Sequence, residues 1–165
     1  MTALRLRLGL PHPSLATYVV CSCGRLLDPL GTHLLCGTSR GERTSSHDFV
    51  RDAIHHIIRE SSQHAHRERS SFLSPSAPWG RGERVDIVIS DAAVGHTLVD
   101  IVVADPTRRD LVERTTRQDL VAATDAVRRK ETHYRDRAAE TKFASFALET
   151  CGALSTRSDR FLVSI

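Results

Sequence analysis

Long apolar runs are absent from this 165-residue sequence. Its N-terminal stretch, MTALRLRLGLPHPSLATYVV, is interrupted by Arg5, Arg7, Pro11 and Pro13. Charges and prolines at these positions argue against both a secretory signal peptide and a transmembrane helix. We therefore expect an intracellular protein, cytosolic or nuclear, with no membrane partner.

Aromatic residues and lysines are also scarce. Aromatic residues make up 5% of the chain, and only two of its 23 basic residues, Lys130 and Lys142, are lysines. The other basic residues are arginines, whose planar guanidinium groups can bind two phosphate oxygens at once. With a net charge of +3, this composition permits nucleic-acid binding without requiring it.

Cysteine is rare as well, but three of the four cysteines are close together. Cys21, Cys23 and Cys36 share the stretch CSCGRLLDPLGTHLLC with His33. Clustered cysteines in an intracellular chain indicate a metal site before a disulfide, and three thiolates with one imidazole suit tetrahedral zinc. The spacings are short, and the alternative is a set of reduced cysteines without metal. We predict an N-terminal segment over residues 1–40 that contains a structural zinc knuckle.

The rest of the chain, residues 41–165, has the apolar periodicity of one α/β domain. A helix is expected over residues 46–61, begun by a capping box of Ser45 and Asp48. Its apolar stripe consists of Val50, Ala53, Ile54, Ile57 and Ile58. Strands are expected at 64–70, 84–90, 96–104 and 143–150, with one long helix from 108 to 139 that buries Leu120, Ala123, Val127 and Tyr134.

Two of the expected strands, RVDIVIS and LVDIVVADP, each contain an aspartate between apolar residues. Burying a single unpaired charge is costly, so one such residue could be a charge that protects a sheet edge. Two aspartates at matching positions, Asp86 and Asp100, are better explained as a pair of oxygen ligands for a divalent cation.

The predicted order of elements resembles the restriction-endonuclease-like, PD-(D/E)XK nuclease fold, with an αβββαβ core. The ordered set CSCG, DPLGTHLLC, RTSSHDFVRDAI, RVDIVI, LVDIVVADP, KETHY and FALET is similar to the C-terminal region of non-LTR retrotransposons with a restriction-like endonuclease, and to related plant and algal sequences. This resemblance covers roughly residues 4–152. It implies a metal-dependent DNA endonuclease that hydrolyses phosphodiester bonds, with structural zinc and catalytic Mg²⁺ or Mn²⁺. It also implies a nuclear location, and a reverse transcriptase or the element's RNA as a further partner.

The resemblance assigns a role to individual residues by position. It implies that Asp86 and Asp100 bind the catalytic metal and that Lys130 is a catalytic lysine shifted onto the following helix. The remaining catalytic assignments are His47, Tyr134 and an outer acid, which is Glu68 or, as the weaker choice, Glu60. From the residues alone, His47 could equally be a core or capping histidine, Lys130 a solvated helix residue and Tyr134 a core residue.

Three departures from the family pattern define an alternative function. Val85 stands in the place of the proline, Ser46 in that of the arginine before the histidine, and Val102 where a lysine is usual. The alternative is a catalytically inactive domain that keeps the nuclease fold and binds nucleic acid or serves a structural role. Arg40 and Arg43, in the polar link after the knuckle, are candidates for phosphate contacts, or else solvated linker residues.

Overall fold

The computed structural model describes residues 10–11, 13–15, 17, 19–21, 23–31, 33, 42–69, 85–92, 95–135 and 142–165. The protein is a mixed α/β structure, and the helix, three strands, helix and strand predicted from the sequence follow one another in that order. The expected long helix is divided into α4 and α5, and a C-terminal helix, α6, was not predicted from the sequence. The elements are η1 Pro13–Leu15, α3 Glu42–Glu60, β1 His64–Arg69, β2 Val85–Asp91, β3 Gly95–Ala104, α4 Val112–Thr115, α5 Val121–Tyr134, β4 Lys142–Glu149 and α6 Thr156–Ser164.

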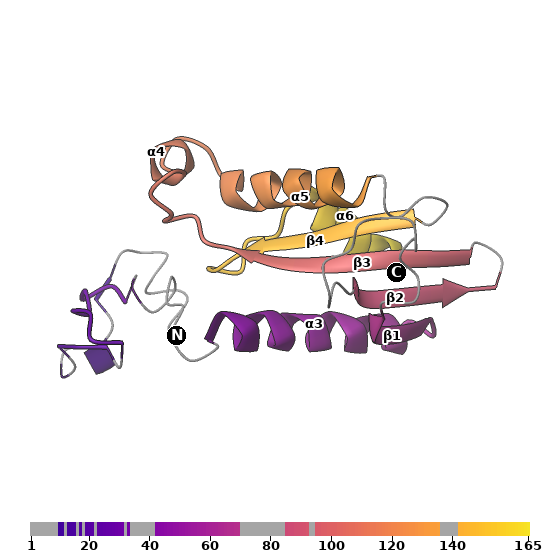
Figure 1. The fold of residues 1–165 in the computed structure, drawn as a ribbon, viewed down its shortest axis with the longest axis horizontal. Helices are drawn as coiled ribbons and strands as arrows, with labels where there is room; N and C mark the ends of the chain where they lie inside the picture. Colours follow the sequence, from indigo (N-terminus) through magenta and orange to yellow (C-terminus); the bar gives the residue numbers. More distant parts are fainter. Residues whose placement is uncertain are drawn as a thin grey trace.

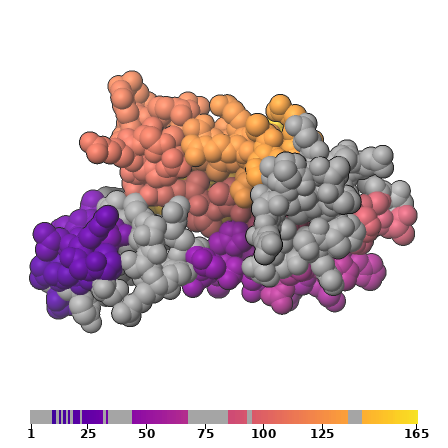
Figure 2. All heavy atoms as spheres, viewed as in Figure 1, coloured from indigo at the N-terminus to yellow at the C-terminus, as the bar shows by residue number. Residues whose placement is uncertain are grey.

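The four strands form one sheet in the order β1-β2-β3-β4. β1 pairs with β2 and β2 with β3 in antiparallel fashion, whereas β3 and β4 are parallel. A parallel pair needs a crossover connection, and α5 supplies it. Helix α3 covers one face of the sheet and α5 the other, as Figure 1 shows. In the space-filling view, the α4–α5 segment (salmon to orange) is visible along the upper edge (Figure 2).

Each face of the sheet has its own apolar cluster. On the α3 face, Ile54 and Ile58 pack with Ile87 and Phe146, and α6 adds Phe161 at the margin. The α5 face holds smaller clusters, in which Val88, Leu98 and Tyr134 group together and Ala123, Val127 and Ala147 form another set. No described helix is long and apolar enough to span a membrane.

Helix α3 begins earlier than the sequence predicted, at Glu42. The expected capping box is therefore wrong, because Asp48 lies inside the helix. Its Oδ1 lies 3.0 Å from Nη1 of Arg51, three residues on, and so pairs with a side chain instead of capping a backbone N–H. The expected stripe is only partly right, since Ile54 and Ile58 are buried but Ile57 is exposed.

The single long helix expected over residues 108–139 is also wrong in its first part. The segment instead forms α4, an irregular turn, and then α5, which begins after Leu120 in a left-handed conformation (φ 61°). Two threonines lie at the break, and their hydroxyls bond to backbone carbonyls: Thr115 donates to Pro106 and Val112, and Thr116 to Glu113. Such bonds compete with helical backbone pairing. Residues 136–139 of that prediction lie outside the described residues.

The buried carboxylate of Glu149, at the end of β4, accounts for the new start of α5. Its Oε1 accepts hydrogen bonds from the backbone N–H groups of Ala122 (3.2 Å) and Ala123 (3.4 Å). These N–H groups belong to the first turn of α5 and have no partner within the helix. A negative charge there also interacts favourably with the helix dipole, so β4 determines where α5 begins.

The free edge of β4 is closed by the N-cap and the first turn of α6. Ser158 is fully buried, and its hydroxyl accepts from Ala147 N (2.7 Å) and donates to Ala147 O (2.8 Å). Ser155 N donates to the same carbonyl at 3.0 Å. The Ser158 side chain therefore satisfies both backbone groups of Ala147, as a neighbouring strand would. This protects an otherwise open sheet edge.

We predict that Ser158→Ala lowers the free energy of unfolding by about 1–3 kcal/mol, because it leaves a buried backbone N–H without its acceptor. Urea unfolding followed by circular dichroism measures this difference. Ser164→Ala is the matched control, since the Ser164 hydroxyl is exposed and bonds only to Phe161 O within its own helix. Equal losses in the two variants would contradict the role assigned to Ser158.

Candidate functional site

Cys21, Cys23 and His33 come together in the N-terminal segment. Their ligand atoms all lie within 4.8 Å of one another, and Cys23 Sγ is 3.0 Å from His33 Nε2. Ligands of one tetrahedral zinc ion lie roughly 3–4 Å apart, given metal–ligand bonds of about 2.0–2.3 Å. The group could therefore hold a metal ion, and its chemistry is compatible with structural zinc. The fourth predicted ligand, Cys36, lies outside the described residues.

A tight backbone turn presents the two cysteines. Val20 and Leu26 form a β-bridge, Cys21 N donates to Arg25 O, and Gly24 N donates to Cys21 O. Gly24 has φ +85°, a backbone conformation that residues with a side chain rarely adopt. The Cys-x-Cys-Gly sequence therefore suits this turn.

Asp28 stabilises the loop between this turn and His33. Its carboxylate accepts from the backbone N–H of Leu30 and from that of His33, each at 3.0 Å. These two bonds hold the loop between the cysteines and the histidine in place. A segment this small has few apolar contacts of its own, and such segments commonly depend on a metal for their order.

The acids predicted for catalysis occupy one row across the sheet. The β2–β3 register runs as far as the pair Ile87–Val99, so its next step sets Asp86 opposite Asp100. On the other side of β2, the position of Glu68 falls between the pairs Arg67–Ile87 and Arg69–Val85, which sets it opposite Asp86. The side chain of Glu68 lies outside what the structure describes, and Glu60 is exposed and pairs with His56 at 3.2 Å.

Asp86 turns its carboxylate toward helix α3. Oδ2 accepts from Ile101 N at 2.7 Å and lies 3.1 Å from Nε2 of His47. The same nitrogen of His47 is 3.1 Å from Ile101 O. The hydrogen bond to Asp86 is the main cause that raises the pKa of His47 from 6.5 to about 9, although partial burial opposes it. His47 therefore carries a positive charge at neutral pH.

Asp100 turns instead toward α5, and only 3% of its surface is exposed. Lys130 Nζ lies 2.7 Å from Oδ2, and the hydroxyl of Tyr134 donates to Oδ1 at 3.2 Å. Burial raises the pKa of Asp100, while the ammonium of Lys130 opposes that shift and the charge of Asp86 adds to it. The two aspartates are thus close enough to influence each other, yet each is compensated by a different helix.

The structure therefore brings together five of the six predicted catalytic residues in two linked contacts. One contact joins His47 and Asp86, and the other joins Asp100, Lys130 and Tyr134. Among the described residues, the cysteine–histidine group is the one set of three or more Cys, His, Asp or Glu ligand atoms within 4.8 Å. The two aspartates do not form such a set with a third acid or histidine.

Sequence reasoning missed two residues of this region. Arg51 is buried one turn after His47 and pairs with Asp48 and Asp52, at 3.0 Å in each case. Its spacing of four from His47 on an otherwise apolar face was the available signal. Arg129, next to Lys130, lines a pocket beside β3, and no pattern in the sequence distinguished it from the other arginines. Arg40 and the side chain of Arg43, predicted to contact phosphates, lie outside the described residues.

We predict that the purified protein contains about one zinc ion per chain and that Cys23→Ser removes most of it, because it eliminates a thiolate ligand. Elemental analysis after dialysis measures the content. Cys151→Ser is the control, since Cys151 follows β4 and belongs to no such ligand group among the described residues. Zinc content that is the same in both variants, or zero in wild type, would contradict the site.

A second prediction concerns pH. The folded protein holds the proton of His47 more tightly than the unfolded chain, because its pKa is raised to about 9. The stabilisation by the His47–Asp86 pair is therefore complete below pH 6.5 and is lost as pH rises through about 9. In chelator-treated protein, the stability difference between wild type and His47→Gln should shrink across that window. His56 is an exposed histidine on the same helix, so the stability difference between wild type and His56→Gln should not change with pH. If the difference for His47→Gln is equally independent of pH, the role of the His47–Asp86 pair is contradicted.

Comparisons with known proteins assign no family to this chain. No model of a known protein family matches it, and a search of curated proteins found no relative. The features that indicate a function are the cysteine–histidine group and the arrangement of Asp86, Asp100 and Lys130.

Proposed function

We propose that the protein is a metal-dependent DNA endonuclease of the restriction-like type, with a structural zinc knuckle. One observation carries the proposal. Asp86 and Asp100 occupy facing positions on neighbouring strands, and Lys130 of the crossover helix lies 2.7 Å from Asp100. Two acids and a lysine at one end of a β2–β3 pair form a group that can support phosphodiester hydrolysis with a divalent cation.

The donor set fits a hard cation. Asp86 Oδ2 and the backbone carbonyl of Ile101 both lie 3.1 Å from His47 Nε2, so two oxygens already converge on one positively charged group. Mg²⁺ and Mn²⁺ prefer such oxygen ligands, and Mg²⁺ commonly uses only one or two carboxylates and completes its shell with water and phosphate. Asp86, Asp100 and Ile101 O are the ligands we assign to it.

When bound, a divalent cation supplies an activated water and neutralises charge on the phosphate oxygens. The chain's own residues do the rest. Lys130 holds an ammonium beside Asp100, where it can bind a phosphate oxygen or the attacking water. Tyr134 donates a hydrogen bond to Asp100 Oδ1 and so orients that carboxylate. His47 Nε2 lies 3.1 Å from Asp86 Oδ2 and so places a positive charge beside that carboxylate.

The arrangement of helices and strands supports the same proposal. An antiparallel β1–β2–β3 unit followed by α5 and a parallel β4 is the αβββαβ order that the family resemblance implies. The acids lie near the start of β2 and the middle of β3. Rigid strands of this kind hold catalytic groups more accurately than loops do.

Plasmid nicking tests the proposal. Wild type should nick supercoiled DNA in Mg²⁺ or Mn²⁺, and Asp100→Ala should abolish nicking while DNA binding persists. Lys130→Ala should slow nicking by about a hundredfold or more, in the range expected when one charge-stabilising group is removed. Lys130→Arg should restore little, because a planar fork does not replace a compact ammonium.

Lys142→Ala and Glu113→Ala are the matched controls, since both side chains are exposed and belong to neither aspartate contact. Both should nick at the wild-type rate. Melting curves must show that every variant is folded. Equal nicking by wild type and Asp100→Ala would reveal a contaminating nuclease and refute the proposal.

A second function is favoured by the compensation of both acids. His47 lies 3.1 Å from Asp86 and Lys130 lies 2.7 Å from Asp100, so each acid has a basic partner within the chain. Val85 and Val102 also differ from the residues that the family pattern has at those positions. A domain that binds DNA without cutting it would have these properties. It would bind DNA with an affinity that falls steeply as salt rises, and would leave plasmid intact in both metals.

A further inference from the structure

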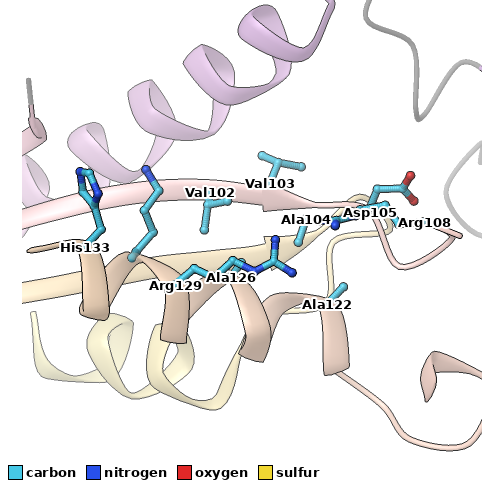
Figure 3. Close-up of a pocket in the computed structure, with 10 residues that line it drawn as sticks. Val102, Val103, Ala104, Asp105, Arg108, Ala122, Ala126, Arg129 and His133 are labelled. Atoms are coloured by element: carbon cyan, nitrogen blue, oxygen red, sulfur yellow. The ribbon is translucent and has the colours of Figure 1, made fainter. Parts of the chain in front are cut away.

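A pocket of about 370 Å³ lies between the end of β3 and one side of α5. Figure 3 shows its two walls, with Val102 and Ala104 on the strand facing Ala122 and Ala126 on the helix. Ala122 and Ala126 are four residues apart and lie on the same face of α5. Their small side chains leave the space open, and their methyl groups make the floor of the pocket apolar.

The rim of the pocket is cationic. Arg108, Arg129 and Lys130 line it, together with His133. Arg108 is already engaged, because Asp110 accepts from its Nε at 3.0 Å and its Nη2 at 2.6 Å. Arg129 makes no ion pair with another described residue, and Figure 3 shows its side chain extending along the pocket beside Ala126. Its guanidinium is therefore the group best placed to receive an anion.

The single acid in the lining does not cancel this charge at the rim. Asp105 is buried, and its Oδ1 accepts from both the backbone N–H (2.8 Å) and the hydroxyl (2.7 Å) of Thr107. These two hydrogen bonds from Thr107 to Asp105 close the turn after β3. The pocket thus combines an apolar floor with a positively charged rim, which suits an organic anion with a flat apolar part.

We propose that this pocket binds one unstacked nucleotide, with its base on the apolar floor and its phosphate at Arg129. The placement rests on the proposed function, because Lys130 both lines the pocket and pairs with Asp100. A strand whose scissile phosphate lies at Asp100 and Lys130 would leave its neighbouring nucleotide at the pocket. The substrate class is then DNA with an unpaired nucleotide at the cleavage point, such as a single strand, a flap or a frayed end.

Size and chemistry favour a nucleotide over the alternatives. The volume is near the lower end of the range for small-molecule sites, about 300–1,000 Å³, and thus suits one nucleotide better than a longer ligand. Inorganic phosphate would leave the apolar floor uncovered. Bases inside a duplex are stacked and cannot enter a pocket without being extruded, which costs free energy. Unstacked bases can lie against apolar side chains and arginine planes at no such cost.

Binding measured in EDTA separates this inference from catalysis. The probes are deoxyadenosine monophosphate, inorganic phosphate, a short single-stranded oligonucleotide and its duplex. We expect the mononucleotide to bind about tenfold more tightly than phosphate, and the single strand more tightly than the duplex, because base contacts add to the phosphate contact. Arg129→Ala should weaken mononucleotide binding by about tenfold or more. Arg128→Ala should leave it unchanged, since Arg128 is exposed and lies near Asp125, outside the pocket.

Filling the pocket gives an independent test. Ala126→Leu adds bulk on the floor and should reduce mononucleotide affinity to that of phosphate, with phosphate binding retained. Thr124→Leu adds a similar side chain on the exposed side of the same helix and should change neither affinity. Melting curves establish that both variants fold. If Ala126→Leu fails to fold, Ala126→Ser and Ala126→Val replace it, and affinity should decrease as volume increases.

The outcomes distinguish the inference from the proposed function. Mononucleotide binding that depends on Arg129 and Ala126 supports the pocket even if no plasmid is nicked. Nicking of fully paired DNA at equal rates by wild type and Ala126→Leu would overturn the pocket and leave the nuclease proposal intact. Equal affinity for mononucleotide and phosphate, or no binding of either, would also overturn it.

Discussion

A carboxylate buried in the middle of the sheet constrains much of this structure. Asp100 is almost fully enclosed, and a charge in that position is stable only with partners that are themselves well placed. Its partners, Lys130 and Tyr134, are four residues apart on α5 and therefore lie on one side of that helix. Both contacts together fix the rotation of α5 about its axis, and Glu149 fixes where the helix begins. The orientation of every other side chain on α5, including Arg129 and Ala126, follows from them.

The unequal lengths of the strands create the space in which the candidate site lies. Within the described residues, β2 pairs with β3 only up to Val99, while β3 continues to Ala104 alongside β4 alone. Asp86 spans this change, because its side chain accepts the N–H of Ile101 that a longer β2 could have paired. The backbone edge of β3 beyond Asp100 is thereby available to His47 from α3 on one side and to the α5 pocket on the other.

The order of elements could be predicted from the sequence because apolar periodicity and strand-forming runs depend on nearby residues. The break before α5 could not, since it depends on Glu149, which is distant in the sequence and bonds to Ala122 and Ala123. The same limit applies to the site. The matching positions of Asp86 and Asp100 were visible in the sequence, but their turning toward different helices depends on His47 and on the packing of α5. A pocket depends on small residues such as Ala126, which leave no signal of their own.

The distribution of charge on the chain limits the long-range attraction that it could exert on a polyanion such as DNA. Its many arginines give a net charge of only +3, and several of those described are already paired, such as Arg51 with Asp48 and Arg114 with Asp125. Such pairs reduce the field that would attract a polyanion from a distance. The proposed attraction to DNA would therefore come from positions where a cation makes no ion pair with an acid. Arg129 makes no ion pair with another described residue and lines the pocket beside Lys130, although its charge also acts on Asp110.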